Sequence, residues 1–168
     1  AKQFKGLVNL TGAGLQQTMH WIRLTGGMPS MTGKDPAAHM LLIRDQFPEV
    51  YQRTYKFLNV LDYMNLKLTG RFVATFDSIL TSWVTDNRNP DDIHYDGDLV
   101  RASGISASKF PEIVPCTEIL GKVKPDVANA LGLAPDVQVV AGAIDSTAAG
   151  IGAGAVEDNA LHLYIGTS

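Results

Sequence analysis

The spacing of apolar residues predicts a helix within the first 30 residues. Leu15, Met19 and Ile22 recur at intervals of four and three, which places them on one face of a helix. Gly26 and Gly27 follow, and a glycine pair is a strong signal for the end of a helix. We therefore expect a first helix that ends close to residue 26.

The next apolar runs predict more helices before residue 70. Asp35-Pro36 marks a helix start, because Asp can accept amide protons at the N-cap and Pro at the first position loses no hydrogen bond. The run Met40–Ile43 is apolar on every side, so we expect this helix to be deeply packed. Pro48 interrupts the run. A further helical stretch is expected over Glu49–Phe57, and another over Leu61–Leu68.

The middle of the chain changes in character. Gly70 stands where a C-terminal glycine cap belongs, and Phe72–Thr75 has the pattern of a short strand. The segment Asp86–Asp98 is rich in Asp, Asn, Pro and Gly, which predicts a surface loop or a pair of turns. A short helix is expected after it, over Asp98–Ala102.

The last third predicts helices alternating with strands. The segments are a short helix over Lys124–Ala130, a strand over Val137–Ala141, a helix of small residues over Thr147–Ala155 and an alternating strand over Leu161–Ile165. We therefore predict an α/β fold, with a helical subdomain before a βαβ segment.

Composition and charge narrow the class of protein. The chain has 168 residues, 45% of them hydrophobic and 18% charged, which excludes intrinsic disorder. The net charge of −3 makes a nucleic-acid partner unexpected, and the single cysteine, Cys116, excludes a disulfide framework. No apolar run approaches the ~20 residues of a membrane span. We expect a soluble, cytoplasmic domain with no membrane contact.

Asp145 is the strongest candidate for chemistry. It follows a predicted strand and precedes a predicted helix, and ligands of open α/β sheets collect at the carboxyl ends of strands. A carboxylate there can take a proton from a substrate hydroxyl, and the amides of a helix start can hold anions. The alternative is that Asp145 only caps the helix, which is a common use of Asp.

Two neighbouring segments also allow a functional and a structural interpretation. The Ala- and Gly-rich stretch 148–154 permits close approach of a ligand or tight packing of the helix against a sheet. Gly166-Thr167-Ser168 can present amides and hydroxyls to a phosphate, or form an ordinary hairpin turn.

A metal site is not expected. The acidic residues between Asp86 and Asp98 do not have the spacing of a calcium loop, which favours a solvated loop. The histidines lie far apart in the sequence and show no metal-binding motif. Cys116 has no assisting motif, so we expect a packed, inert thiol.

Read together in order, several segments resemble the FGGY carbohydrate kinases, and most closely their xylulokinase-like pentulose kinases. The matching stretches are Phe47–Tyr51, Lys56–Leu58, Asp62-Tyr63 through Leu68–Gly70, Val139–Asp145 with Ala148–Gly154, and Leu163–Ser168. The ordered set covers the chain from about residue 15 to its end, and it is far more specific than any single stretch.

The resemblance implies an actin/hexokinase-like (ribonuclease H-like) architecture, in which sugar and ATP meet in a cleft between domains. Residues 1–155 would form the later part of the N-terminal sugar-binding FGGY domain, and residues 156–168 the first strand and turn of the C-terminal ATP-binding domain. The chain lacks an initiator Met and stops at the Gly-Thr-Ser turn. We therefore expect it to be an internal fragment.

The resemblance also assigns roles to particular residues. Asp145 falls on the catalytic base and binds the sugar, and Ser146 is its neighbour at the sugar. Gly166, Thr167 and Ser168 fall on the second phosphate-contacting loop. Mg²⁺ is expected to accompany ATP, because phosphoryl transfer relies on positioning and charge neutralisation.

The implied function is ATP-dependent phosphorylation of a sugar hydroxyl, with a ketopentose such as D-xylulose as substrate. The isolated chain is expected to be inactive, since the family's first phosphate loop and adenosine-binding segment lie outside it. His39, Leu42 and Ser146 depart from the family pattern, and these departures keep open a non-catalytic sugar-binding or regulatory module. A third alternative is that the helical first half forms homodimer contacts.

Overall fold

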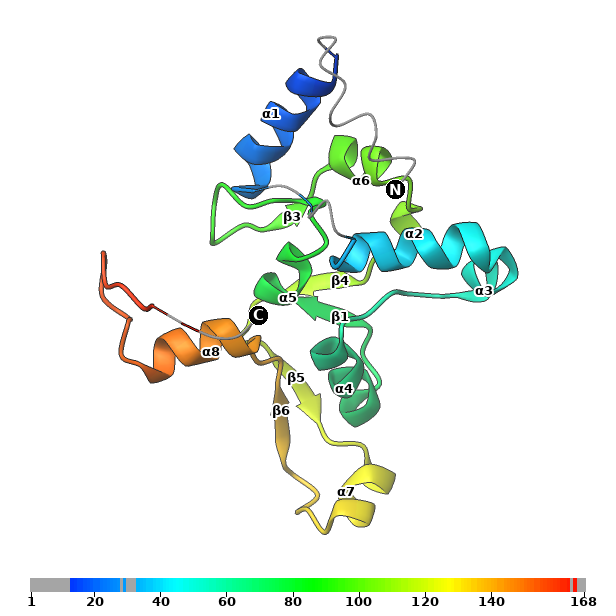
Figure 1. Cartoon of the computed structure of the whole chain (residues 1–168). Helices are drawn as coiled ribbons and strands as arrows, with labels where there is room; N and C mark the ends of the chain where they lie inside the picture. Colours follow the sequence, from blue (N-terminus) through cyan, green and yellow to red (C-terminus); the bar gives the residue numbers. More distant parts are fainter. Residues whose placement is uncertain (1–12, 28, 30–32, 164, 166–168) are drawn as a thin grey trace.

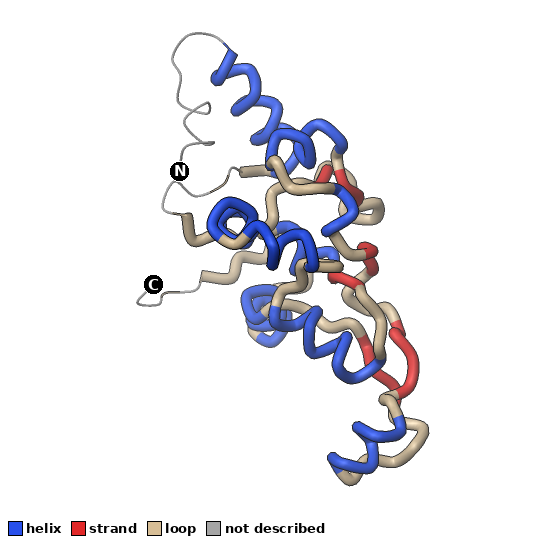
Figure 2. The backbone as a smooth tube through the Cα atoms, turned by 90° about the vertical axis from the view of Figure 1, so that its right-hand side faces the viewer, coloured by secondary structure: helices blue, strands red, loops and turns tan. Residues whose placement is uncertain are grey.

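The computed structural model describes residues 13–27, 29, 33–163 and 165 (Figure 1). Within this part, Figure 2 shows that helices predominate and that the strands are short. The helices are α1 (Ala13–Thr25), α2 (Pro36–Gln46), α3 (Pro48–Arg53), α4 (Val60–Thr69), α5 (Phe76–Leu80), α6 (Gly97–Ser103), α7 (Pro125–Leu131) and α8 (Asp145–Gly152). The strands are β1 (Val73–Thr75), β2 (Thr85–Asp86), β3 (His94–Tyr95), β4 (Glu112–Val114), β5 (Ile119–Lys122) and β6 (Gln138–Val140).

Local signals placed most of these elements correctly. α1 ends just before the predicted glycine stop, and α2 begins at Pro36, as expected. α4 ends at Gly70, whose φ of 84° lies in the left-handed region that glycine adopts without strain. Gly104 and Gly132 end α6 and α7 in the same way. Caps and breakers therefore located these helix ends, whereas α5 (Phe76–Leu80) was not predicted and α8 begins two residues before the expected Thr147.

Two expectations about the helical half are wrong. α2 is not packed on every side: Met40 and Leu41 are buried, but Leu42 is 56% exposed. α3 ends at Arg53 and does not continue to Phe57. The Phe57 N–H donates to the carbonyl of Lys109 at 2.8 Å, so a contact distant in sequence takes the donor that a longer helix would have used.

The parallel pair β1–β4 divides the core. Val73 pairs with Glu112 and Thr75 with Val114. Successive side chains of a strand point to opposite faces, so Val73 and Ala74 pack into different apolar clusters. Every residue of β1 is buried.

The segment predicted as a surface loop is closed by a small antiparallel pair. In this β2–β3 pair Asp86 lies opposite His94. The Asp86 carboxylate accepts hydrogen bonds from Arg88 Nε at 2.9 Å and from another guanidinium nitrogen of Arg88 at 2.5 Å. This interaction lowers the pKa of Asp86 to about 2, with further help from the Arg88 amide.

The C-terminal third only partly matches the predicted βαβ order. β5 and β6 form an antiparallel pair with α7 at its tip, and α8 follows β6 (Figure 1). The predicted strand Leu161–Ile165 is not formed: residues 161–163 and 165 are exposed and belong to no strand. Alternation alone does not make a strand, because its backbone groups need a pairing partner. No described helix is long and apolar enough to cross a membrane.

We expect Gly70→Ala to destabilise the fold through backbone strain. The added Cβ would meet no atom within 4 Å, so the loss comes from the positive φ and amounts to about 1 kcal/mol. Gly70→Asn is the matched comparison and should lose less, because Asn tolerates the left-handed region better than Ala. Urea denaturation checks the order; equal losses would contradict the conformational explanation.

We expect Asp86 to contribute stability that depends on pH. Its folded-state pKa of about 2 lies below the ordinary 3.8, so the stabilisation is present above pH 3.8 and is lost as pH falls toward 2. Asp86→Asn should therefore lower the urea midpoint at neutral pH and flatten its fall in acid. Asp91→Asn, in the exposed turn of the same hairpin, is the control and should leave the acid profile unchanged.

Candidate functional site

Asp145 lies at the exposed start of α8, on the segment that follows β6. Ile144 occupies the N-cap position and Asp145 is the first helical residue, so Asp145 is not the N-cap. Asp145 Oδ1 accepts a hydrogen bond from the Ser146 N–H at 2.8 Å. Both side chains are exposed. The structure therefore presents the predicted base and its neighbour together at the start of a helix, where negative charge is favoured.

The connection from β6 to α8 is held by hydrogen bonds from several elements. The Ala141 N–H donates to the Glu118 carbonyl at 2.9 Å, and the Gly142 N–H donates to the Cys116 carbonyl at 2.9 Å. The buried Asn65 side chain, on α4, donates from Nδ2 to the Ala141 carbonyl at 2.8 Å. These contacts fix where the strand ends and where the path to Asp145 begins.

Asp77 accepts the hydrogen bond that lies closest to the start of α8 along this connection. Its Oδ2 accepts a hydrogen bond from the Ile144 N–H at 2.9 Å, and its Oδ1 accepts one from the Thr75 hydroxyl at 2.7 Å. Figure 1 shows α8 beginning beside α5, the helix that carries Asp77. The turn after β1 and the start of α8 are thus joined through one carboxylate.

The environment of Asp77 favours its charged form. Partial burial by itself raises the pKa of Asp77. Hydrogen bonds from Thr75, the Ile144 amide, Cys116 and Thr147 outweigh burial and leave the pKa below its ordinary value. Asp77 is therefore an anion held by donors from three parts of the chain.

Beneath this contact lies Asp62, a carboxylate with 0% exposure on α4. Its oxygens accept hydrogen bonds from the Ser78 hydroxyl at 2.5 Å and from the Thr75 N–H at 3.2 Å. Asn59 Nδ2 donates to the Ser78 carbonyl at 2.9 Å. Burial raises the pKa of Asp62 despite these donors. Asp62 and Asn59, at and near the start of α4, therefore hold Thr75 and Ser78, the residues that flank Phe76 and Asp77.

Sequence reasoning missed Asp62, Asn65 and Asp77. A signal was present, since Asp62 and Asn65 stand three residues apart and so share one face of a predicted helix. Asp77 follows a predicted strand, as Asp145 does. Nothing in the local pattern indicated that the two strand ends meet.

Cys116 agrees with the expectation of an inert thiol. It is half-buried, and burial raises its pKa. A thiol with a raised pKa is a poor nucleophile at neutral pH.

The small residues of α8 are not packed against a sheet. No residue of this helix is buried. A Cβ added at Gly150 would have His162 Nδ1 as its nearest contact, at 3.7 Å, and one added at Gly152 would meet nothing within 4 Å. The tight-packing interpretation is therefore wrong for the described chain, whereas ligand approach stays a prediction. Gly166, Thr167 and Ser168 lie outside the described residues.

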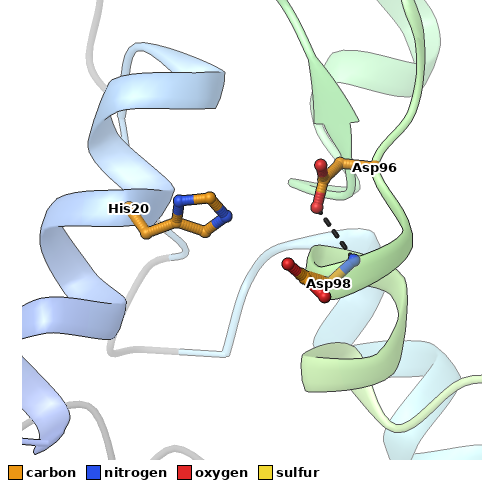
Figure 3. Close-up of side chains that lie close together, drawn as sticks. All are labelled: His20, Asp96 and Asp98. Carbon is orange, nitrogen blue, oxygen red and sulfur yellow. Dashed lines mark hydrogen bonds between the residues drawn. The ribbon is translucent and has the colours of Figure 1, made fainter.

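Among the residues that the structure describes, tertiary folding gathers one set of metal-type ligands, which does not include Asp145. His20 on α1 faces Asp96 and Asp98 at the start of α6 (Figure 3), and their donor atoms lie within 4.8 Å of one another. Asp96 Oδ1 already accepts from the Asp98 and Leu99 N–H groups, and Asp98 pairs with Arg101. Capping and ion pairing in α6 account for both carboxylates.

An apolar groove of about 560 Å³ lies elsewhere, along α4 and the segment before it. Tyr55, Tyr63 and Phe72 are among its walls, and the rings of Tyr55 and Phe72 meet edge to face with centroids 4.9 Å apart. Asp145 and Ser146 do not line this groove. It is therefore separate from the candidate base.

Comparison with known proteins finds carbohydrate kinases, both by family model and by individual relatives. Residues 14–152 match the model of the N-terminal domain of the FGGY family of carbohydrate kinases. The chain is 33% identical over 143 residues to a xylulose kinase of Escherichia coli K12, covering 84% of the chain and 28% of that protein. It is 26% identical over 133 residues to a gluconokinase of Bacillus subtilis 168, covering 79% of the chain and 25% of that protein.

Solved structures agree on the fold. A xylulose kinase from Rhodospirillum rubrum superposes with a TM-score of 0.73 at 26% identity, over 86% of this chain and 29% of that one. A ligand-bound xylulose kinase from Lactobacillus acidophilus superposes with a TM-score of 0.71 at 23% identity. The match covers 82% of this chain and 27% of that one. The fold is the mixed α/β fold of these N-terminal domains, as the sequence predicted. The chain spans about a quarter of the length of the curated relatives it matches.

We expect Asp62 to stabilise the turn through hydrogen bonds rather than through charge. Asp62→Asn can still accept from the Thr75 N–H and donate to Ser78, so it should change the unfolding free energy by less than ~1 kcal/mol. Asp62→Ala leaves buried groups without partners and should lose ~2–4 kcal/mol. Urea denaturation followed by circular dichroism measures both, with exposed Asp126→Ala as control; equal losses for Asn and Ala would contradict this account.

Proposed function

The chain belongs to the FGGY family of carbohydrate kinases, and from that premise we propose that it supplies the catalytic base of an ATP-dependent sugar kinase. The observation that carries the proposal is Asp145. Its carboxylate is exposed, and it follows the segment between β6 and α8. Side chains of α4 and α5 hold this segment by hydrogen bonds. A base must be both reachable by the substrate and fixed in position; the exposure of Asp145 supports the first requirement, and the hydrogen bonds that hold the residues before α8 support the second.

The proposed reaction follows from the chemistry of a carboxylate. Asp145 takes the proton of a sugar hydroxyl while the hydroxyl oxygen attacks the γ-phosphorus of ATP. The bond between the γ-phosphorus and the bridging oxygen of the β-phosphate breaks, and ADP leaves with that electron pair. The products are a sugar phosphate, ADP and one proton, which passes from Asp145 to solvent.

The neighbouring residues receive complementary roles. Ser146, next to the base and equally exposed, contacts the sugar. Gly166, Thr167 and Ser168 contact ATP phosphates through amides and hydroxyls. In this assignment residues 1–155 belong to the sugar-binding domain, and residues 156–168 begin the ATP-binding domain.

The proposed substrate is a ketopentose such as D-xylulose. Xylulose kinases recur among the relatives, which supports this choice. Gluconokinases, a rhamnulokinase and an L-fuculokinase occur there too, so the shared chemistry is a polyhydroxylated sugar or sugar acid. A panel of ketoses, polyols and sugar acids tested with the full-length protein separates these substrates.

Mg²⁺ is expected to enter with ATP. This ion commonly keeps several waters and binds substrate phosphates together with one or two carboxylates. In the described part of the chain, Asp145 belongs to no group of three metal-type ligands. The proposal therefore places the ion on the nucleotide phosphates, where it neutralises charge, and no protein cage is invoked.

Asp145→Asn in the full-length protein tests the proposed base. The amide keeps the shape of the side chain but cannot take the proton, so kcat should fall at least ~100-fold while the fold is retained. A coupled assay of ADP release and the urea midpoint measure the two effects.

The matched control is Asp126→Asn, which changes an exposed acid in the first turn of α7 and should leave kcat unchanged. Near-normal turnover of Asp145→Asn would remove Asp145 from its role. Sugar binding by a wild-type protein that shows no turnover with any member of the panel would favour the non-catalytic sugar-binding module.

A further inference from the structure

We propose that Asp77 is a positioning residue, which holds the backbone before Asp145 and so sets the direction from which the base meets the sugar hydroxyl. The inference rests on the function proposed for Asp145. It arises from a contact between positions 67 residues apart in the sequence, where Asp77 Oδ2 accepts from the Ile144 N–H at 2.9 Å.

Asp145 needs such a support because α8 is weakly anchored by packing. No residue of α8 is buried, so apolar packing contributes little to holding the helix in place. The Asp145 carboxylate bonds to the N–H of Ser146, a group that moves together with the helix itself. The position of the base therefore depends on polar contacts at the start of α8, and Asp77 makes two of them, with the Ile144 amide and with the Thr147 side chain.

Asp77 is well suited to fix that position. Its second oxygen accepts from the Thr75 hydroxyl at 2.7 Å, so both oxygens are engaged and the carboxylate cannot turn freely. Thr75 is itself held, because its N–H donates to the fully buried Asp62. A chain of hydrogen bonds thus runs from the core, through the end of β1, to the residue before the base.

A second side chain, Asn65, also holds the segment between β6 and α8, but at a point further from Asp145. Asn65 Nδ2 donates to the carbonyl of Ala141, at the end of β6, four residues before Asp145. Asp77 binds the residue immediately before Asp145. Loss of the Asp77 contact should therefore displace the base most directly, and a displacement of ~1 Å at a reacting group can lower the rate ~100-fold.

Kinetics of the full-length protein provide the first test. Asp77→Ala should lower kcat by roughly 10–100-fold and leave KM for ATP nearly unchanged, because the step that suffers is proton removal. Asp77→Asn should recover most of kcat, since its amide oxygen can accept from Ile144 while its NH₂ donates to Thr75. Asp126→Ala, an exposed acid in the first turn of another helix, is the control and should match wild type.

Amide hydrogen exchange of the 168-residue chain provides a readout independent of activity. Asp77→Ala should speed exchange at the Ile144 amide roughly 10-fold, and Asp77→Asn should leave it close to wild type. Exchange at the Ala141 and Gly142 amides, whose acceptors are Glu118 and Cys116, should change less. A uniform rise at every amide would indicate global destabilisation and would overturn a positioning role.

The outcomes separate this inference from the proposed function. If Asp145→Asn abolishes turnover and Asp77→Ala leaves kcat unchanged, the positioning role alone is overturned. If Asp145→Asn leaves turnover intact, the proposed base falls, and its positioning residue falls with it. If Asp77→Asn is as damaging as Asp77→Ala, the contact does not act through hydrogen-bond geometry, and the inference is wrong.

Discussion

The hydrogen bond from the Ile144 amide to the Asp77 carboxylate is the constraint on which the candidate site depends. It joins the first turn of α5, which follows the buried strand β1, to the start of α8, two places 67 residues apart in the chain. α8 has no buried side chain, so the hydrophobic effect that orders the rest of the fold does little for this helix. A directional polar contact holds its beginning instead, and a fixed direction is what a catalytic base requires.

Asp77 is linked to the core through Thr75, which hydrogen-bonds both to Asp77 and to the buried Asp62. Asp62 is completely buried, and burial raises its pKa, yet its oxygens are satisfied by Ser78 and Thr75. A half-satisfied buried carboxylate would destabilise the fold, whereas a satisfied one specifies a single arrangement of its donors. β1 lies between two apolar clusters, so the strand that carries Thr75 is fixed on both faces.

The start of α8 is exposed, and the small side chains of this helix leave open space beside it. Gly152 has open space where a side chain would be, and Gly150 meets only ordinary contact. Larger residues would stabilise an isolated helix by propensity but would fill that space. The chain belongs to the FGGY family of carbohydrate kinases, and the exposed, unfilled side of α8 is compatible with the sugar-binding role proposed for Asp145.

The sequence by itself determined the start of α2 and the ends of α4 and α7, because Pro36, Gly70 and Gly132 act through local backbone geometry. Its ordered motifs also pointed to the family and to Asp145. Only the tertiary structure decided that α3 stops early, that residues 161–163 and 165 form no strand, and that Asp77 reaches Ile144. The physical reason is that periodicity and capping report on neighbours within a few residues. Strand pairing and buried hydrogen bonds join positions far apart, and they form only once the whole chain has packed.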